Sequence, residues 1–321
     1  MKDENENDSP KTLQEAINYF SDPDVALEFA VSIRWPDGVK CPRCGSSHVS
    51  FTAKRRVWTC ENCPKRQQFS VKVGTIMEDS PLKLDKWLTA IWLISSAKNG
   101  ISSHELHRAL CITQKSAWFL GHRIRLALQS GTMEKMSGHV EADETYIGGK
   151  ARLMNNKQKR KRGRGTGGVG KAIVMGLLQR GRKGKTSMVK VKHVPNAKRA
   201  TVQGEVREYV LKGSRVFTDA LRSYNGLEQD YIHKAIDHAV CYVKGNVHTN
   251  GLENFWCLLK RCFRGTHVSV EPFHLFRYLD EEAFRFNNRT EKDGDRFLKA
   301  VGGISGRRLM YRQLIGANAP E

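Results

Sequence analysis

The sequence predicts an α/β protein in which two small N-terminal modules precede a larger domain with a mixed sheet flanked by helices. Three observations favour this architecture: four clustered cysteines, a helical pattern that starts at Pro81, and an ordered series of strand and helix patterns from residue 138 onward. The chain has 321 residues, more than one ordinary domain of about 150 residues needs. Several folded units are therefore expected.

The charge of the chain indicates a polyanionic partner. Lys and Arg number 54 against 33 Asp and Glu, which gives a formal net charge of +21. Such a charge attracts phosphate backbones through counterion release, whatever the base sequence. The alternative is a protein that is basic without binding nucleic acid.

The sequence gives no indication of a membrane span or a secretory signal. The longest apolar run, Trp87 to Ala97, is interrupted by Thr89, Ser95 and Ser96. The N-terminus, MKDENENDSP, is acidic and polar, whereas a secretory signal is basic and then apolar. We therefore expect a cytoplasmic protein.

Two C-x2-C pairs separated by 15 residues predict a structural zinc ribbon. They are formed by Cys41, Cys44, Cys60 and Cys63. This spacing matches four-thiolate zinc sites, and the alternating residues between the pairs predict a hairpin. A redox dithiol is the alternative, but it needs only one such pair near a βαβ unit. The remaining cysteines lie singly in apolar stretches and are expected in the core: Cys111, Cys241, Cys257 and Cys262.

Residues 81–128 predict three helices. Apolar residues of 81–100 follow one helical stripe, and a capping box formed by Ser102 and Glu105 starts the second helix. Thr113 can cap the third helix. If this is a helix-turn-helix-like DNA-binding unit, the base-reading positions are Gln114, Lys115 and Ser116. A plain helical bundle is the alternative.

The C-terminal half shows strand patterns at residues 138–147, 171–180 and 187–194, a helix at 198–212, a strand that ends at Asp219, and a helix at 248–263. Three strands, a helix, a strand and a helix form the layout of a ribonuclease H-like fold.

Acidic residues stand at three positions of this layout. Asp143 in the first strand and Asp219 at the end of the fourth lie side by side if those strands pair. Glu253, in the last helix, can supply a third oxygen ligand to a divalent cation, and Lys260 lies two turns later on the same face. Each acid also has a structural interpretation: an ion pair for Asp143, a turn cap for Asp219 and a first-turn helix acid for Glu253. Glu141 shares the face of Asp143 and is the alternative ligand.

The three acids, the segments ADETYIGGK, FTDALRSY and HTNGLENFWCLLKR, and the preceding zinc ribbon together resemble insertion-sequence transposases of the DDE class. More narrowly, the chain resembles the zinc-ribbon group related to Merlin elements. The resemblance covers about residues 20–290.

This resemblance implies a nucleoid-associated DNA transposase with Mg²⁺ or Mn²⁺ at Asp143, Asp219 and Glu253. Two-metal chemistry hydrolyses a phosphodiester at the element end and joins the freed 3′-hydroxyl to target DNA. The expected partners are the element ends, the target DNA and at least one further copy of the chain, without a membrane or a nucleotide cofactor. The family also implies that Lys260 contacts DNA near the cleaved end.

A basic insertion at residues 150–171 is expected to bind the DNA backbone, although a solvated loop is the alternative. Its candidate contacts are Lys159, Arg160, Lys161, Arg162 and Arg164.

The predicted boundaries are an N-terminal segment at 1–35, the ribbon at 36–75, the helical domain at 76–132, the catalytic domain at 138–290 and a C-terminal tail at 291–321. Two rival functions remain. One is a nuclease or resolvase that cuts without joining, and the other is a zinc-dependent DNA-binding regulator derived from a transposase.

Overall fold

The computed structural model describes residues 9–129, 134–148, 171–182, 184–236 and 247–316. The chain divides into two compact units. Unit 1 comprises Met1–Gln129 and Glu291–Glu321, and unit 2 comprises Ser130–Thr290. Among the described residues, no helix combines the length and the apolar character needed to cross a membrane.

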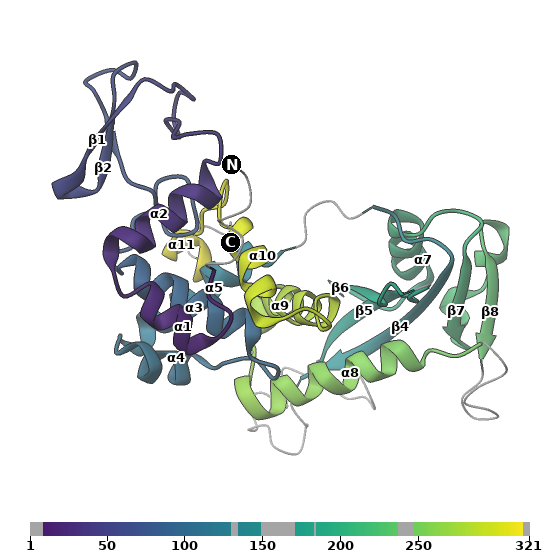
Figure 1. The fold of residues 1–321 in the computed structure, drawn as a ribbon. Helices are drawn as coiled ribbons and strands as arrows, with labels where there is room; N and C mark the ends of the chain where they lie inside the picture. Colours follow the sequence, from purple (N-terminus) through teal and green to yellow (C-terminus); the bar gives the residue numbers. More distant parts are fainter. Residues whose placement is uncertain (1–8, 130–133, 149–170, 183, 237–246, 317–321) are drawn as a thin grey trace. The chain divides into compact units, whose positions relative to one another are not determined.

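Unit 1 combines a small antiparallel sheet with helices from both ends of the chain. The sheet has the order β1-β2-β3, with β1 at Val49–Thr52, β2 at Val57–Cys60 and β3 at Gln68–Phe69. Its helices are α1 (Leu13–Tyr19), α2 (Pro23–Arg34), α3 (Leu84–Ser96), α4 (Ser103–Leu110), α5 (Gln114–Ala127), α10 (Asp293–Gly302) and α11 (Tyr311–Leu314), the last two in yellow in Figure 1.

An aromatic cluster joins the two ends of the chain in unit 1. Phe297 of α10 is buried, and its ring lies 5.7 Å from that of Phe20, 5.8 Å from Phe29 and 4.9 Å from Trp92, measured between centroids. Helix α10 therefore completes the core that α1, α2 and α3 begin. The sequence contained no motif from which we could predict this role for residues 291–321.

The predicted starts of the second and third helices of 81–128 are confirmed in unit 1, whereas the first helix begins at Leu84, after the predicted Pro81. Ser102 and Glu105 form the capping box of α4, with the Ser102 hydroxyl accepting from the Glu105 amide at 3.2 Å. The Thr113 hydroxyl accepts from the Ser116 amide at 3.2 Å and caps α5. Between the two helices, Cys111 takes a left-handed conformation with φ 51°. A short turn thus links α4 to α5, as a helix-turn-helix requires.

Unit 2 contains a five-stranded mixed sheet with the order β6-β5-β4-β7-β8 (Figure 1). The strands are β4 (His139–Ile147), β5 (Ala172–Gln179), β6 (Met188–Val194), β7 (Arg215–Asp219) and β8 (Ile232–Ile236). Strand β5 is antiparallel to β4 and β6, whereas β7 is parallel to β4 and β8. The predicted mixed sheet is confirmed.

Helices lie against both faces of this sheet. They are α7 (Arg199–Tyr209), α8 (Asn250–Cys262) and α9 (Leu275–Asn287). Val202 and Val206 of α7 pack in one core cluster with Leu177 of β5, and Leu252 and Phe255 of α8 pack in the other core cluster. Successive residues of a strand point to opposite faces, so one sheet supplies both cores.

Strand β8 is an element that the sequence interpretation did not include. Among the described strands it pairs with β7 alone, and its residues range from the exposed Ile232 to the buried Ile236. A short edge strand with mixed polarity has neither a clear alternation nor a continuous apolar run, which is why the pattern did not reveal it.

Short helical turns complete the description: 3₁₀ turns at Ala53–Arg55, Arg222–Tyr224, Leu227–Gln229 and Pro272–His274, and a π-helical turn at Phe263–His267.

Candidate zinc and carboxylate sites

The four ribbon cysteines converge on one point in unit 1. Their ligand atoms all lie within 4.8 Å of one another. The Sγ atoms of Cys41 and Cys63 are 3.8 Å apart, those of Cys44 and Cys60 are 3.6 Å apart, and those of Cys44 and Cys63 are 3.5 Å apart. A tetrahedron with Zn–S bonds of about 2.3 Å has edges of about 3.8 Å, so the cluster fits a zinc ion. The predicted structural zinc is thus supported, and four thiolates leave no open coordination position.

The local fold explains this convergence. The Gly45 amide donates to the Cys41 carbonyl at 2.9 Å, and Gly45 has φ +75°, so the first C-x2-C wraps a tight turn. The second pair begins at the last residue of β2, where the Cys60 amide donates to the Gln67 carbonyl at 3.0 Å. Trp58 and Phe69 stack beneath the cluster with centroids 6.0 Å apart. The metal site therefore rests on the small core of the ribbon.

The three candidate base readers at the start of α5 differ in their surroundings. Lys115 is exposed, and its Nζ lies 4.9 Å from the ring centroid of Tyr311 in α11. Gln114 donates to the Ser103 hydroxyl at 3.0 Å, and the Ser116 hydroxyl accepts from Thr113 at 2.9 Å. Lys115 is therefore the most available of the three for a partner.

The sheet register brings two of the predicted acids together in unit 2. Glu141 pairs with Phe217 between parallel β4 and β7. Continued by two residues, this register places Asp143 beside Asp219, which ends β7. Glu253 lies in the first turn of α8 and acts electrostatically on Asp143, as does Asp219. The three acids thus contribute to one negative field.

Asp143 is held by a tryptophan of α8. The Trp256 indole Nε1 donates to Asp143 Oδ2 at 2.8 Å. Burial raises the pKa of Asp143 to about 6, the carboxylates of Asp219 and Glu253 raise it further, and the Trp256 hydrogen bond opposes them. In the described part of the chain, no arginine is paired with Asp143, so the ion-pair interpretation of this residue is not what the structure shows.

A glycine makes room for this tryptophan. Gly176 of β5 is the Cα partner of Asp143 across the antiparallel pair. A Cβ at Gly176 would lie 2.7 Å from two ring carbons of Trp256 and 2.9 Å from Leu252. Separations under about 3 Å are repulsive, so the indole reaches Asp143 only because residue 176 has no side chain.

Glu141 has a structural role. It is 1% exposed, and its Oε1 accepts from Arg180 Nε at 2.7 Å. Its Oε2 accepts from the Leu252 amide at 3.0 Å, at an α8 N-terminus where Thr249 provides no side-chain cap. A Cβ at Gly251 would lie 2.8 Å from the same carboxylate oxygen. Glu141 therefore caps α8 from the sheet, and both of its oxygens have partners in these contacts.

Glu144 is a carboxylate that the sequence interpretation did not assign to the site. Burial raises its pKa to about 8, the Tyr224 hydroxyl opposes that shift, and Asp219 and Asp143 add to it. Neither Glu144 Oε1 nor the buried Tyr224 Oη has a well-formed hydrogen bond to any described residue. The sequence signal was the acid pair Asp143-Glu144 itself, but strand alternation assigned Glu144 to the other face.

The acids also show the structural features that their alternative interpretations predict. Asp219 Oδ1 accepts from the Leu221 amide at 3.2 Å, as a turn cap does, and Glu253 is a first-turn acid of α8. Among the described residues, the four cysteines are the one set of three or more ligand groups within 4.8 Å of one another. The three carboxylates, which lie on separate elements, are therefore not gathered as closely as the four thiolates.

The same two regions match known proteins. An ISXO2-like transposase domain model matches residues 135–287, and a transposase zinc-ribbon domain model matches residues 21–66. A relative named as a transposase-like protein, from Haemophilus influenzae, is 36% identical over 110 residues, which are 34% of this chain and 88% of the relative. The chain belongs to the ISXO2-like transposase family.

A second relative extends the similarity along most of this transposase-family chain. It is named as a protein in the transposable element ISH50 of Halobacterium salinarum, and it is 29% identical over 295 residues. These cover 86% of this chain and 94% of the relative. No solved structure matches the chain.

The transposase-domain match includes Asp143, Asp219 and Glu253, and the zinc-ribbon match includes all four ribbon cysteines together with α2. Lys260 is half-buried on α8, seven residues after Glu253. The insertion candidates Lys159, Arg160, Lys161, Arg162 and Arg164 lie outside the described residues.

One expectation for the cysteines of this transposase is wrong in part. Cys262 is buried, as predicted, but Cys111 and Cys257 are exposed. Cys111 occupies the left-handed turn after α4, and Cys257 lies on the outer face of α8. For Cys257, apolar neighbours in sequence do not bury a residue whose own helical angle points to solvent. Cys241 lies outside the described residues.

Proposed function

We propose that this protein is a DNA transposase that binds element ends, hydrolyses a phosphodiester to free a 3′-hydroxyl and joins that hydroxyl to target DNA at the site of Asp143, Asp219 and Glu253. The observation that carries the proposal is the parallel register of β4 and β7, which places Asp143 beside Asp219 at the end where α8 presents Glu253. Membership in a transposase family agrees with it.

The donor set suits Mg²⁺ or Mn²⁺. Hard divalent cations prefer carboxylate oxygens. Burial raises the pKa of Asp143, and the negative charges of Asp219 and Glu253, which a cation would neutralise, add to that rise. Asp143 would hold two ions, and Asp219 and Glu253 one each. Such ions supply stabilisation of the attacking and leaving oxygens in a phosphodiester displacement.

The chain itself supplies orientation. Trp256 donates to one oxygen of Asp143 and so restricts the rotation of this carboxylate. Glu141 anchors the start of α8 one residue before Glu253. A rigid constellation loses little free energy to reorganisation when the substrate binds.

Other parts of the chain would bind DNA. Lys115 in unit 1 is an exposed cation at the start of a helix that follows a short turn, the position from which such helices contact base edges. Lys260 of α8 and the basic insertion at 150–171 would contact backbone phosphates, and Gln114 and Ser116 would assist Lys115. Because two element ends must be brought together, the active form would be at least a dimer, acting at the nucleoid.

The test is a strand-transfer assay with purified zinc-loaded protein, Mg²⁺, a precleaved element end and a plasmid target. Asp143→Asn and Asp219→Asn keep the shape of each side chain and remove its charge. Joined products are expected with the wild type and are expected to vanish in both variants. Glu208→Ala removes an exposed carboxylate of the same unit and is expected to leave joining unchanged.

Two outcomes would replace the proposal. Cleavage of uncut ends without joining would make the protein a nuclease or resolvase. Zinc-dependent DNA binding with neither cleavage nor joining would make it a regulator.

A further inference from the structure

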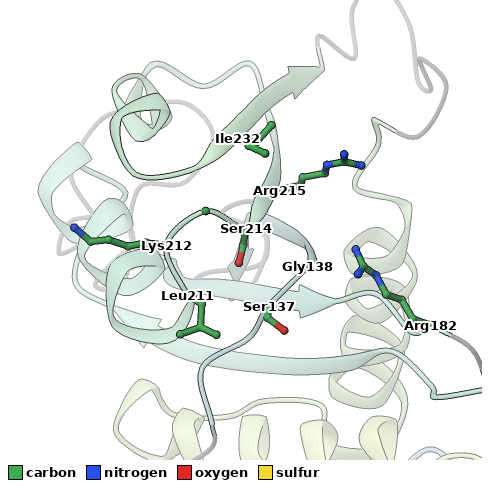
Figure 2. Close-up of a pocket in the computed structure, with 9 residues that line it drawn as sticks. Ser137, Gly138, Arg182, Leu211, Lys212, Ser214, Arg215 and Ile232 are labelled. Atoms are coloured by element: carbon green, nitrogen blue, oxygen red, sulfur yellow. The ribbon is translucent and has the colours of Figure 1, made fainter.

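A basic pocket lies in unit 2 at the end of the sheet that is opposite to the carboxylates. Its volume is about 460 Å³. Strands β4, β7 and β8 all begin at this end of the sheet, whereas Asp219 is the last residue of β7 at the opposite end. The pocket is lined by Ser137, Gly138, Arg182, Leu211, Lys212, Gly213, Ser214, Arg215 and Ile232 (Figure 2).

Two arginines give the pocket its charge. Figure 2 shows Arg182 and Arg215 on one side and Lys212 on the other. Lys212 pairs with Asp230 at 2.9 Å. Within the described ranges, no carboxylate lies within ion-pair distance of Arg182 or Arg215. The side chain of Arg215 instead lies 3.2 Å from the imidazole Nε2 of His139. The two guanidinium groups therefore keep most of their capacity for an anion.

The position of the Arg182 side chain depends on a glycine in the neighbouring backbone. Gly138 has φ +79°, and a Cβ there would lie 2.9 Å from the guanidinium carbon of Arg182. The Arg182 side chain thus packs over Gly138, which has no side chain. Burial and the charges of Arg182, Arg215 and Arg180 lower the pKa of His139, which reports a positive field at this end of the sheet.

The pocket also offers apolar surface beside its cations. Leu211 and Ile232 line it and expose 47% and 51% of their surface. Free phosphate has no apolar part, whereas a nucleic-acid backbone presents a deoxyribose beside each phosphate. Paired cations beside exposed aliphatic side chains therefore suit a sugar-phosphate backbone better than a small anion.

We propose that this pocket binds a backbone phosphate of duplex DNA, remote from the phosphodiester that is cut, with Arg182 and Arg215 as its ligands. The inference rests on the proposed function. Arg215 and Asp219 are the first and last residues of β7, so four residue steps of about 3.3 Å separate them by about 13 Å along the strand. A duplex that contacts the protein at both ends of β7 would have its orientation across the sheet fixed by the pocket and its position fixed by the acids.

The test measures DNA affinity and its salt dependence without catalysis. Full-length zinc-loaded protein, free of Mg²⁺, is titrated into a fluorescein-labelled duplex at several salt concentrations, and binding is followed by anisotropy. Arg182→Ala/Arg215→Ala is expected to weaken binding roughly tenfold. The slope of log affinity against log salt is expected to fall by about 1, because about one counterion is released per phosphate contact.

Two variants serve as controls. Lys198→Ala/Arg199→Ala removes the same charge from the exposed start of α7 and is expected to leave the slope nearly unchanged. Arg182→Lys/Arg215→Lys keeps the charge and is expected to restore most of the slope. The four substituted residues, Arg182, Lys198, Arg199 and Arg215, are exposed, so the melting temperatures of the variants should match that of the wild type.

The outcomes separate this inference from the proposed function. If the wild type binds DNA and Arg182→Ala/Arg215→Ala binds with the same affinity and slope, the pocket is not a DNA site although the proposed function stands. If the wild type does not bind duplex DNA, both fail. A calorimetric titration with inorganic phosphate forms a third arm. Tight phosphate binding that the variant loses, with DNA affinity unchanged, would overturn the inference in favour of a small-anion site.

Discussion

Trp256 donates a hydrogen bond from its indole Nε1 to Oδ2 of Asp143 at 2.8 Å. The two residues belong to a helix and a strand and are 113 positions apart in sequence. This bond connects one of the two cores of unit 2 to its candidate active site, because the indole packs in the same core cluster as Phe255 and Leu252 and donates to a carboxylate.

Trp256→Phe should therefore separate catalysis from folding. Phenylalanine keeps most of the buried ring and loses the donor to Asp143. Hydrogen bonds to charged groups contribute about 1.5 to 3 kcal/mol, so strand transfer should fall roughly tenfold or more. The assay is initial-rate joining of a precleaved end, with the melting temperature measured alongside. Unchanged joining would show that Asp143 needs no positioning by the indole.

Gly176→Ala tests the space that this arrangement needs. The new Cβ would lie 2.7 Å from the Trp256 ring, so the free energy of unfolding should fall by about 1 to 3 kcal/mol and joining should decrease. Urea unfolding gives the free energy. The matched control is Gly204→Ala in α7, where a Cβ meets nothing within 4 Å, and a gain of about 0.5 to 1 kcal/mol is expected. Equal effects of the two substitutions would contradict the steric argument.

Removal of the metal should unfold the ribbon. Cys44→Ser is expected to abolish stable zinc binding, because a structural site holds its ion through all four thiolates. Elemental analysis measures the zinc, and limited proteolysis near residues 40–66 reports the loss of structure. Cys111→Ser and Cys257→Ser, at exposed cysteines outside the cluster, should keep the zinc of the wild type. A Cys44→Ser protein that retains zinc after dialysis would refute a four-thiolate site.

Glu144→Gln should remove one component of the pH dependence of stability. The pKa of Glu144 rises from 4.5 to about 8 in the folded chain, so the unfolded chain releases this proton at lower pH than the folded chain does. The free energy of unfolding therefore falls as the pH rises from about 4.5 to 8, and a neutral glutamine abolishes that fall.

The measurement is the melting temperature of both proteins across this range without Mg²⁺. The difference in favour of Glu144→Gln should grow up to about pH 8 and then level off. A difference that is independent of pH would mean that Glu144 ionises normally in the folded chain.

Local sequence patterns predicted the elements with strong local signals. The spacing of Cys41, Cys44, Cys60 and Cys63 requires no long-range information, because each C-x2-C closes its own turn. The caps at Ser102 and Thr113 are likewise contacts between residues three positions apart. The order of strand and helix patterns was sufficient for the mixed sheet.

The helices at the two ends of the chain were not predicted, for a physical reason. The place of α10 in unit 1 depends on Phe297 meeting Phe20, Phe29 and Trp92, contacts between residues as much as 277 positions apart. Periodicity within a segment carries no information about which distant face will cover it. The exposed Cys111 and Cys257 show the same limit for single residues.

Residue types and their spacing were sufficient to predict the candidate ligands, namely a thiolate set, three acids in order and an excess of cations, because ligand character depends on residue type. The tertiary structure decided their roles. Glu141 and Asp143 lie on the same strand face, yet Glu141 accepts from the Leu252 amide and Arg180, whereas Asp143 accepts from the Trp256 indole. Hydrogen bonds and charge pairs form between residues that are distant in sequence, and only the packing of α8 on the sheet determines which carboxylate each donor reaches.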